Sequence, residues 1–213
     1  MKVWFGFIVL VPGFFALPVL PAFSQNKALK GLLHKEKGQV NQLKEVVITN
    51  KKVNIVGVNG YTPEMWVGLS LKGKAGYAEI GQLIRISSMV RLLNVNVGTS
   101  GFKGARDSVS FRLNIYKFEN GLPGERLIEK NIIKSFSKDS EMLRFDLSAE
   151  QVFLEEDCVL SLEYLPKERN KKLSLLSFRA NMMAKGGFSR IENTGKWSPM
   201  RSGAAAIFAE VEQ

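Results

Sequence analysis

The densest group of ionisable side chains in the sequence is the acidic run Glu155-Glu156-Asp157. Carboxylate oxygens are the ligands that Ca²⁺ prefers, and a pair of carboxyl groups can also serve as the acid and base of glycoside hydrolysis. The run directly precedes an alternating segment, where a turn is expected and where acidic side chains are commonly solvated and prevent edge pairing. A calcium site would need oxygen ligands from further segments, so the sequence favours a solvated turn and keeps calcium as the alternative.

Aromatic residues in polar, glycine-containing segments are stronger candidates for binding. Sugar rings stack on exposed aromatic faces, and binding residues collect in loops on a rigid scaffold. The alternative is that these rings fold back onto the core, because they bury much apolar area. The candidate ligand-binding residues are Trp197, Trp66, Phe188, Tyr61 and Tyr77. Among them Trp197, which lies between Lys196 and Ser198-Pro199, is the first to test.

The sequence lacks the motifs of common catalytic centres. Its only histidine, His34, lies in a polar, basic segment without convergent partners, so neither a Ser-His-Asp triad nor a zinc site is expected. No Gly-x-Ser-x-Gly motif occurs, and the glycine-rich stretches lack the Gly-Lys-Ser/Thr of a phosphate-binding loop. We therefore expect a protein that is not an enzyme and needs no cofactor, with a hydrolase based on Glu155 or Glu156 as the less favoured alternative.

The scaffold for these residues is predicted by the segment from Arg106 to Pro166, where periodicity is clearest. Apolar residues occupy every second position of 108–116, which is typical of a strand with one face in a core and one in water. Residues 142–147 and 158–164 alternate in the same way, and Asn120-Gly121-Leu122-Pro123-Gly124 is typical of a turn. A series of short alternating strands separated by turns predicts an all-β, antiparallel sandwich of jelly-roll type.

Other strands and loops are predicted from less regular patterns. Strands are expected around Ile80 to Ile86, over Leu127 to Phe136 and over Ala204 to Val211. In Leu93-Asn94-Val95-Asn96-Val97 the three aliphatic residues are expected to share one face. Loops are expected over Gly98 to Asp107 and Met182 to Pro199.

The first 52 residues differ in composition from the rest. Residues 1–24 resemble a secretory signal peptide, with Lys2, a long apolar run, and small residues at the two positions of Ala22-Phe23-Ser24 that a signal peptidase recognises. The run is also long enough for an uncleaved membrane anchor, although three prolines favour the signal. Residues 25–52 are expected to form a linker with a short strand or helix, and residues 53–213 the sandwich.

Charge and cysteine content restrict the partners. The chain has 30 Lys and Arg against 20 Asp and Glu, a formal net charge of +10. This balance fits anionic partners or a basic solubilising surface, and membrane contact is expected only through the leader or that surface. Nucleic acid is not expected, because no binding motif occurs and the leader directs the chain to the envelope. Cys158 is the only cysteine, so no intrachain disulfide can form, and it is expected to be buried.

Two stretches resemble segments of bacterial envelope proteins. Leu43-Lys44-Glu45-Val46-Val47-Ile48-Thr49 resembles the Leu-x-Glu-Val-Val-x-Thr segment that leads into the plug of TonB-dependent outer-membrane proteins and follows carboxypeptidase-regulatory-like domains. The elements from Gly81 onward resemble secreted bacterial β-sandwich proteins of unassigned function that are found behind such domains, and are loosely similar to carbohydrate-binding jelly rolls. The matching residues are Phe111-Arg112-Leu113-Asn114-Ile115-Tyr116, the turn 120–124, Glu129-Lys130-Asn131-Ile132-Ile133, Leu160-Ser161-Leu162-Glu163-Tyr164 and Gly195-Lys196-Trp197.

The resemblance implies secretion across the inner membrane to the periplasm, the outer-membrane surface or the exterior. Together with the residues above, it leads us to expect a non-catalytic binding module for a glycan or an envelope protein. The ligand would be bound by loops at one end of the sandwich. The alternative is a structural accessory subunit of an outer-membrane complex that docks through an edge strand.

Overall fold

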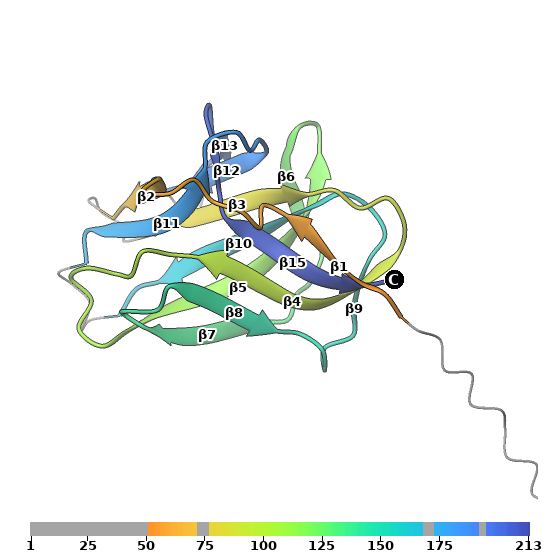
Figure 1. The fold of residues 1–213 in the computed structure, drawn as a ribbon, viewed down its shortest axis with the longest axis horizontal. Coiled ribbons are helices and arrows are strands. Elements are labelled where there is room, and N and C mark those ends of the chain that lie inside the picture. The colour runs from red at the N-terminus through yellow and green to blue at the C-terminus, as the bar shows by residue number, and fades with distance from the viewer. Residues whose placement is uncertain (1–50, 72–76, 168–172, 192–194) are drawn as a thin grey trace, which may run out of the picture. The chain divides into compact units, whose positions relative to one another are not determined.

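The computed structural model describes residues 51–71, 77–167, 173–191 and 195–213. These residues form fifteen β-strands and no helix (Figure 1). None of this part of the chain is therefore a helix long and apolar enough to cross a membrane. The predicted signal peptide (residues 1–24), most of the predicted linker and the TonB-type segment lie outside the described residues.

The strand bounds follow in chain order. They are β1 (Val53–Gly57), β2 (Trp66–Ser70), β3 (Glu79–Ile84), β4 (Val90–Gly98), β5 (Ser108–Glu119), β6 (Leu122–Arg126), β7 (Ile132–Ser137), β8 (Met142–Asp146), β9 (Val152–Leu154), β10 (Cys158–Leu165), β11 (Leu175–Asn181), β12 (Gly187–Arg190), β13 (Ser198–Pro199), β14 (Ala204–Ala205) and β15 (Ile207–Glu212).

The strands form three antiparallel sheets. A five-stranded sheet has the order β1-β15-β4-β8, with β9 also paired to β4. A seven-stranded sheet has the order β13-β12-β3-β10-β5-β6, with β7 also paired to β5, and a three-stranded sheet has the order β14-β11-β2. Figure 1 shows β4, β15 and β1 in front of β10 and β5, so that the two larger sheets are the layers of a sandwich. The predicted all-β, jelly-roll-like antiparallel sandwich is confirmed.

The core lies between the layers and is built from the alternating residues. The odd positions of β5 from Val109 to Ile115 are buried in it, as are Cys158, Leu160 and Leu162 on β10. The ring of Phe111 is 5.4 Å from that of Phe102 and 6.2 Å from that of Phe178, measured between centroids. Because Phe178 belongs to β11, this aromatic cluster joins the three-stranded sheet to the sandwich.

Three local predictions were wrong. The turn at Asn120 and Gly121, which both have positive φ, is only two residues long, so β6 begins at Leu122 and the next strand only at Ile132. Leu93 does not share a face with Val95, because the pairing of β4 with β15 shifts register there and places Leu92 in the core instead. The expected loop from Met182 to Pro199 contains β12 and β13.

The outer face of β5 also differs from the prediction. Ser110, Asn114 and Tyr116 were expected to face water, yet all three are buried. Phe188 from β12 and Trp197 cover the outer face of the sheet, where they form a cluster with Tyr116 of β5 and Val159 of β10. The alternation of apolar and polar residues along β5 indicated correctly which of its residues share a face. It carried no information on whether a second layer covers the polar face.

The thiol of Cys158 is expected to be unreactive while the protein is folded. It is fully buried, and burial, together with the carboxylates of Asp157 and Glu156, raises its pKa to about 12. A disulfide reagent at pH 8 should leave the native protein unmodified and react at once in guanidinium chloride. Rapid modification of the native protein, with unchanged circular dichroism, would contradict this placement.

Candidate functional site

The outer face of the three-stranded sheet carries an exposed tryptophan beside a strand position without a side chain. Cross-strand pairing puts Trp66 opposite Arg179, Gly68 opposite Ser177, and Ser70 opposite Leu175. The alternate residues of both strands, among them Leu69 and Phe178, point into the core. Since Gly68 has no side chain, the Leu175 side chain can lie directly over it, beside Trp66. A Cβ atom at Gly68 would lie 2.9 Å from Cδ1 of Leu175.

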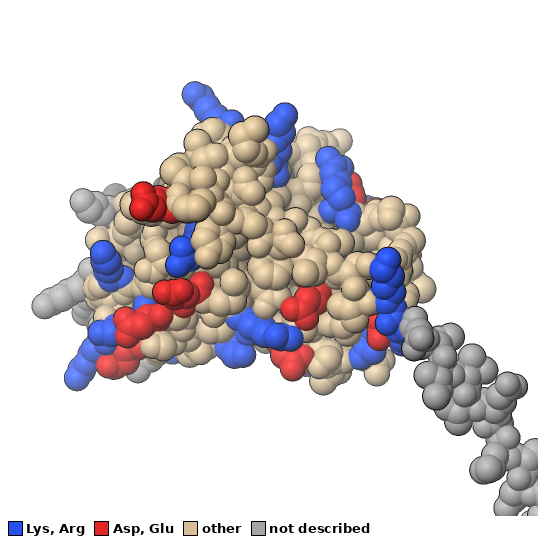
Figure 2. Space-filling view, viewed as in Figure 1, with Lys and Arg blue, Asp and Glu red and all other residues tan. Residues whose placement is uncertain are grey.

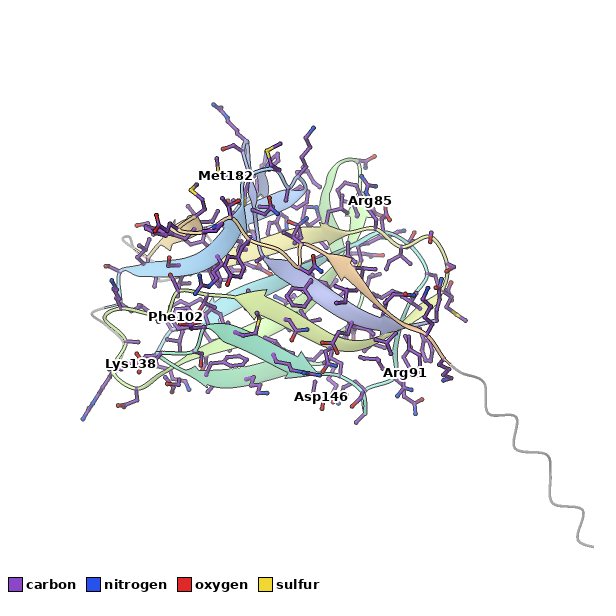
Figure 3. The ribbon with its side chains drawn as sticks, viewed as in Figure 1. Arg85, Arg91, Phe102, Lys138, Asp146 and Met182 are labelled. Atoms are coloured by element: carbon purple, nitrogen blue, oxygen red, sulfur yellow. The ribbon has the colours of Figure 1, made fainter. Side chains whose placement is uncertain are left out.

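The loop after β4 forms the other wall of this space. An isolated bridge pairs Thr99 with Phe178, and Arg179 Nε donates to the carbonyl of Thr99 at 3.2 Å. Gly101 has a φ of +81°, which turns the chain so that the ring of Phe102 enters the core. The amide of Phe102 donates to the carbonyl of Lys138 at 2.7 Å, and Figure 3 shows these two residues at the same end of the sandwich. The loop is therefore held by its backbone and by one buried ring.

Together these elements enclose an open pocket of about 240 Å³. Its lining residues are Trp66, Ser100, Gly101, Lys103, Leu175 and Ser177. The Trp66 side chain is 58% exposed, and Ser100 Oγ donates to Ser177 Oγ at 2.9 Å. The pocket thus combines a large apolar ring, a pair of hydroxyl groups and one ammonium group, which can bind a ring-shaped polar ligand.

Tyr61 extends the aromatic surface beside this pocket. The Arg179 guanidinium lies 4.6 Å from the centroid of the Tyr61 ring, and Arg179 is also the cross-strand partner of Trp66. The Tyr61 side chain is 45% exposed. Two of the predicted binding residues, Trp66 and Tyr61, are therefore brought to one surface through a shared arginine.

The other three predicted aromatic residues lie together elsewhere, on the outer face of the seven-stranded sheet. Phe188 and Tyr77 are buried. Trp197 is half-buried, with its ring in an edge-to-face contact with that of Tyr116 at 5.4 Å and the Arg190 guanidinium 4.7 Å from its centroid. This is the arrangement expected if loop aromatics cover the sheet. A ligand-binding role for these three residues stays a prediction.

The acidic run lies at the turn before β10, as expected. Asp157 accepts hydrogen bonds from the backbone amide of Ile86 at 2.9 Å and from Arg85 at 2.5 Å, and the amide hydrogen bond, opposed by partial burial and assisted by Arg85, lowers its pKa. Glu156 is exposed and lies 3.9 Å from Lys117, and Glu155 is exposed as well. Within the described ranges, no three acidic, histidine or cysteine side chains gather as metal ligands would. Calcium binding by this run stays a prediction.

A second polar cluster, which the sequence did not reveal, lies under Trp197. Cross-strand pairing aligns Arg190, Glu79, Glu163 and Arg112 in one row across β12, β3, β10 and β5. Glu79 has no solvent exposure, and Arg190 Nη2 donates to its Oε2 at 2.5 Å. Its other donors are Tyr77 OH at 2.6 Å, Ser161 Oγ at 2.6 Å, Asn114 Nδ2 at 2.8 Å and Tyr116 OH at 3.1 Å.

The donors decide the charge of this buried carboxylate. Burial raises the pKa of Glu79, but the hydrogen bonds from Ser161, Tyr77 and the other donors outweigh it, so that the pKa lies below its usual value. Burial and the Glu79 carboxylate raise the pKa values of Tyr77 and Tyr116. Glu79 therefore stays ionised and Arg190 stays charged at neutral pH. A carboxylate held by five donors and closed to solvent is suited to fixing four strands together.

Sequence reasoning missed Glu79, Asn114, Ser161 and Arg190 because each looks like an ordinary water-facing residue in its own strand. The available signal was the presence of polar residues at corresponding positions in several central strands. These polar residues can be assigned to one cluster only when the cross-strand register is known.

Comparisons with known proteins show the fold. No family model and no curated protein matches the sequence. The chain is similar to a solved structure of the clostridial cysteine protease Cwp84 after propeptide cleavage, with a TM-score of 0.52 and 10% identity over 76% of this chain and 40% of that one. A structure of the cysteine protease and lectin-like domains of Cwp84, a surface layer associated protein of Clostridium difficile, gives a TM-score of 0.48 and 10% identity over 70% and 36%. This chain thus matches less than half the length of either structure.

Replacing Glu79 with Gln should destabilise the fold strongly. The change leaves the Arg190 charge buried without its partner, and breaking a buried pair in this way costs about 3–5 kcal/mol. Urea unfolding followed by tryptophan fluorescence measures the loss. Glu150→Gln, which removes an exposed pair with Lys130, is the matched control and should cost less than about 1 kcal/mol.

The same variant gives a pH signature. Because the folded state lowers the pKa of Glu79, its contribution is present above the pKa of the unfolded chain and is lost as pH falls through the folded value. Between pH 6 and pH 3 the wild type should therefore lose more stability than Glu79→Gln. Equal losses of stability in the two proteins would show that the hydrogen-bond donors do not lower the pKa of Glu79.

Proposed function

We propose that this chain is a non-catalytic glycan-binding module of the cell envelope or exterior, and that the ligand binds in the pocket of Trp66, Leu175, Ser100 and Ser177. The observation that carries the proposal is an exposed tryptophan ring beside a hydroxyl pair in a pocket of about 240 Å³. A sugar ring has an apolar C–H face and polar edges, and this pocket offers a matching surface for each.

The hydroxyl pair leaves hydrogen-bonding capacity for a ligand. Ser100 Oγ donates its proton to Ser177 Oγ, so the Ser177 proton and the lone pairs of Ser100 stay available to a sugar hydroxyl. Leu175, which is 45% exposed, adds a second apolar surface to the pocket. The backbone that carries these groups is fixed by strand pairing and by the buried ring of Phe102, so little ordering is required on binding.

Two features support binding without turnover. The described lining of the pocket contains no carboxylate, histidine or cysteine side chain. Glu79 and Glu163, the acidic pair on the seven-stranded sheet, are bridged by Asn114 Nδ2 at 2.8 and 3.1 Å, and Glu79 is closed to solvent. Glycoside hydrolysis requires two carboxyl groups in contact with the substrate. The predicted leader supports the envelope location.

Trp66→Ala should weaken glycan binding without changing the fold. The ring is largely exposed, so its loss costs little stability, whereas truncating the main aromatic contact should weaken binding at least about tenfold. A glycan array followed by calorimetry on the best ligand measures the effect. Phe153→Ala on β9, which removes another exposed ring, is the matched control and should bind like the wild type.

Gly68→Ala tests the shape of the pocket while keeping the tryptophan. The added Cβ would displace the flexible end of Leu175 and narrow the space, so affinity should fall in this variant too. A well-folded Trp66→Ala protein that binds the same glycans as the wild type would show that the site lies elsewhere.

A second candidate function is an accessory subunit that docks through an edge strand. Among the described strands β1 pairs only with β15, and its Val53 and Ile55 side chains are 54% and 55% exposed. A partner strand could pair with the free edge of β1.

Ile55→Lys should then prevent a partner from copurifying with the protein from envelope extract, because a charge at the edge blocks strand addition. Ile133→Lys on β7, another exposed isoleucine on a strand with one partner, is the control. Copurification that survives Ile55→Lys would exclude docking through β1.

A further inference from the structure

We propose that the Trp66 pocket selects acidic saccharides, and that the Lys103 ammonium binds the carboxylate of a uronic acid. This inference rests on the proposed function and adds the ligand class. It starts from the charge of the pocket lining, in which Lys103 is the only charged residue among the six. One ammonium at the edge of a stacking surface fits one carboxylate at the edge of a sugar ring.

Lys103 is available to a ligand. It is exposed and forms no ion pair with any side chain in the described part of the chain. Its ammonium group has three donors, and a charge-assisted hydrogen bond to a carboxylate is roughly twice as strong as a neutral one. The backbone on its N-terminal side is held, because Phe102 is buried and its amide donates to the carbonyl of Lys138 at 2.7 Å.

The groups next to the pocket carry charges of both signs. The Arg179 guanidinium lies 4.6 Å from the centroid of the Tyr61 ring, and it pairs with Glu141, whose Oε2 is 3.5 Å away and whose side chain is 79% exposed. Lys138 and Asp139 follow on the neighbouring turn, next to Gly101, and their charges offset each other. Glu141 is thus occupied with Arg179 and leaves Lys103 free to bind an anion.

The pocket suits a sugar carboxylate better than a polyphosphate. Lysine binds phosphate in proteins together with backbone amides or further basic side chains, whereas Lys103 is a single point charge beside an apolar ring. On the face shown in Figure 2, basic and acidic side chains alternate over the surface. That face therefore offers no continuous basic track of the kind that a nucleic-acid backbone requires.

The experiment compares two ligands that share the sugar ring and differ in charge. Purified protein is titrated by calorimetry with oligogalacturonate and with its methyl ester, which keeps the ring and removes the negative charge. The acid should bind about tenfold more tightly than the ester, because only the acid forms the charged contact with Lys103. Lys103→Gln should reduce the affinity for the acid to that for the ester and leave the ester unchanged. Lys196→Gln, an exposed lysine outside the pocket, is the control with the same charge change.

The outcomes separate the two proposals. Equal affinity for acid and ester, with both lost in Trp66→Ala, would overturn the charge selection and leave the glycan-binding function standing. An equal loss of acid binding in Lys103→Gln and Lys196→Gln would also overturn it, in favour of attraction by the whole basic surface. Absence of binding to either ligand and to a broad glycan array, with folded protein, would overturn the proposed function itself.

Discussion

The burial of one carboxylate constrains much of this structure. Glu79 has no contact with solvent, and removing an ion of this kind from water costs several kcal/mol unless its partners replace the lost hydration. Those partners come from three other strands of the seven-stranded sheet and from the segment that carries Tyr77. The outer face of this sheet must therefore stay covered, and Phe188 and Trp197 are part of the cover.

This requirement separates the aromatic residues into two groups with different surroundings. Those over Glu79 are held by packing and by Arg190, which leaves little of their surface for a ligand. Trp66 lies on another sheet, where the next residue of its strand on the same face is Gly68 and the ring is exposed. The two regions are joined through the core, since Phe178 beneath the pocket contacts Phe111 on β5. A rigid, doubly covered sheet thus supports the strand and loop that form the pocket.

The sequence predicted the sandwich because alternation along a strand is a local property. The inner faces of β5 and β10 could be read from Val109 to Ile115 and from Cys158 to Leu162 without knowledge of their neighbours. The row from Arg190 to Arg112 could not, because it depends on the register of four strands that are distant in sequence. Trp66 was predicted as a binding residue, but its pocket also depends on Ser177 lying opposite Gly68, which the pairing of β2 with β11 decides. Leu93 shows a smaller limit of the same kind, since the register shift that removes it from the core lies in the pairing with β15.

The net positive charge of the chain acts over longer distances than the contacts within the pocket. A formal charge of +10 attracts any anionic polymer, but exposed charges are screened beyond about 8 Å at physiological ionic strength. Where acidic and basic side chains alternate, as on the face in Figure 2, the long-range field cannot distinguish one polyanion from another. Discrimination must then come from contacts in which a charge and a shape are recognised together. In the described structure the Lys103 ammonium and the Trp66 ring meet this condition, because they line one pocket and can contact the same sugar residue.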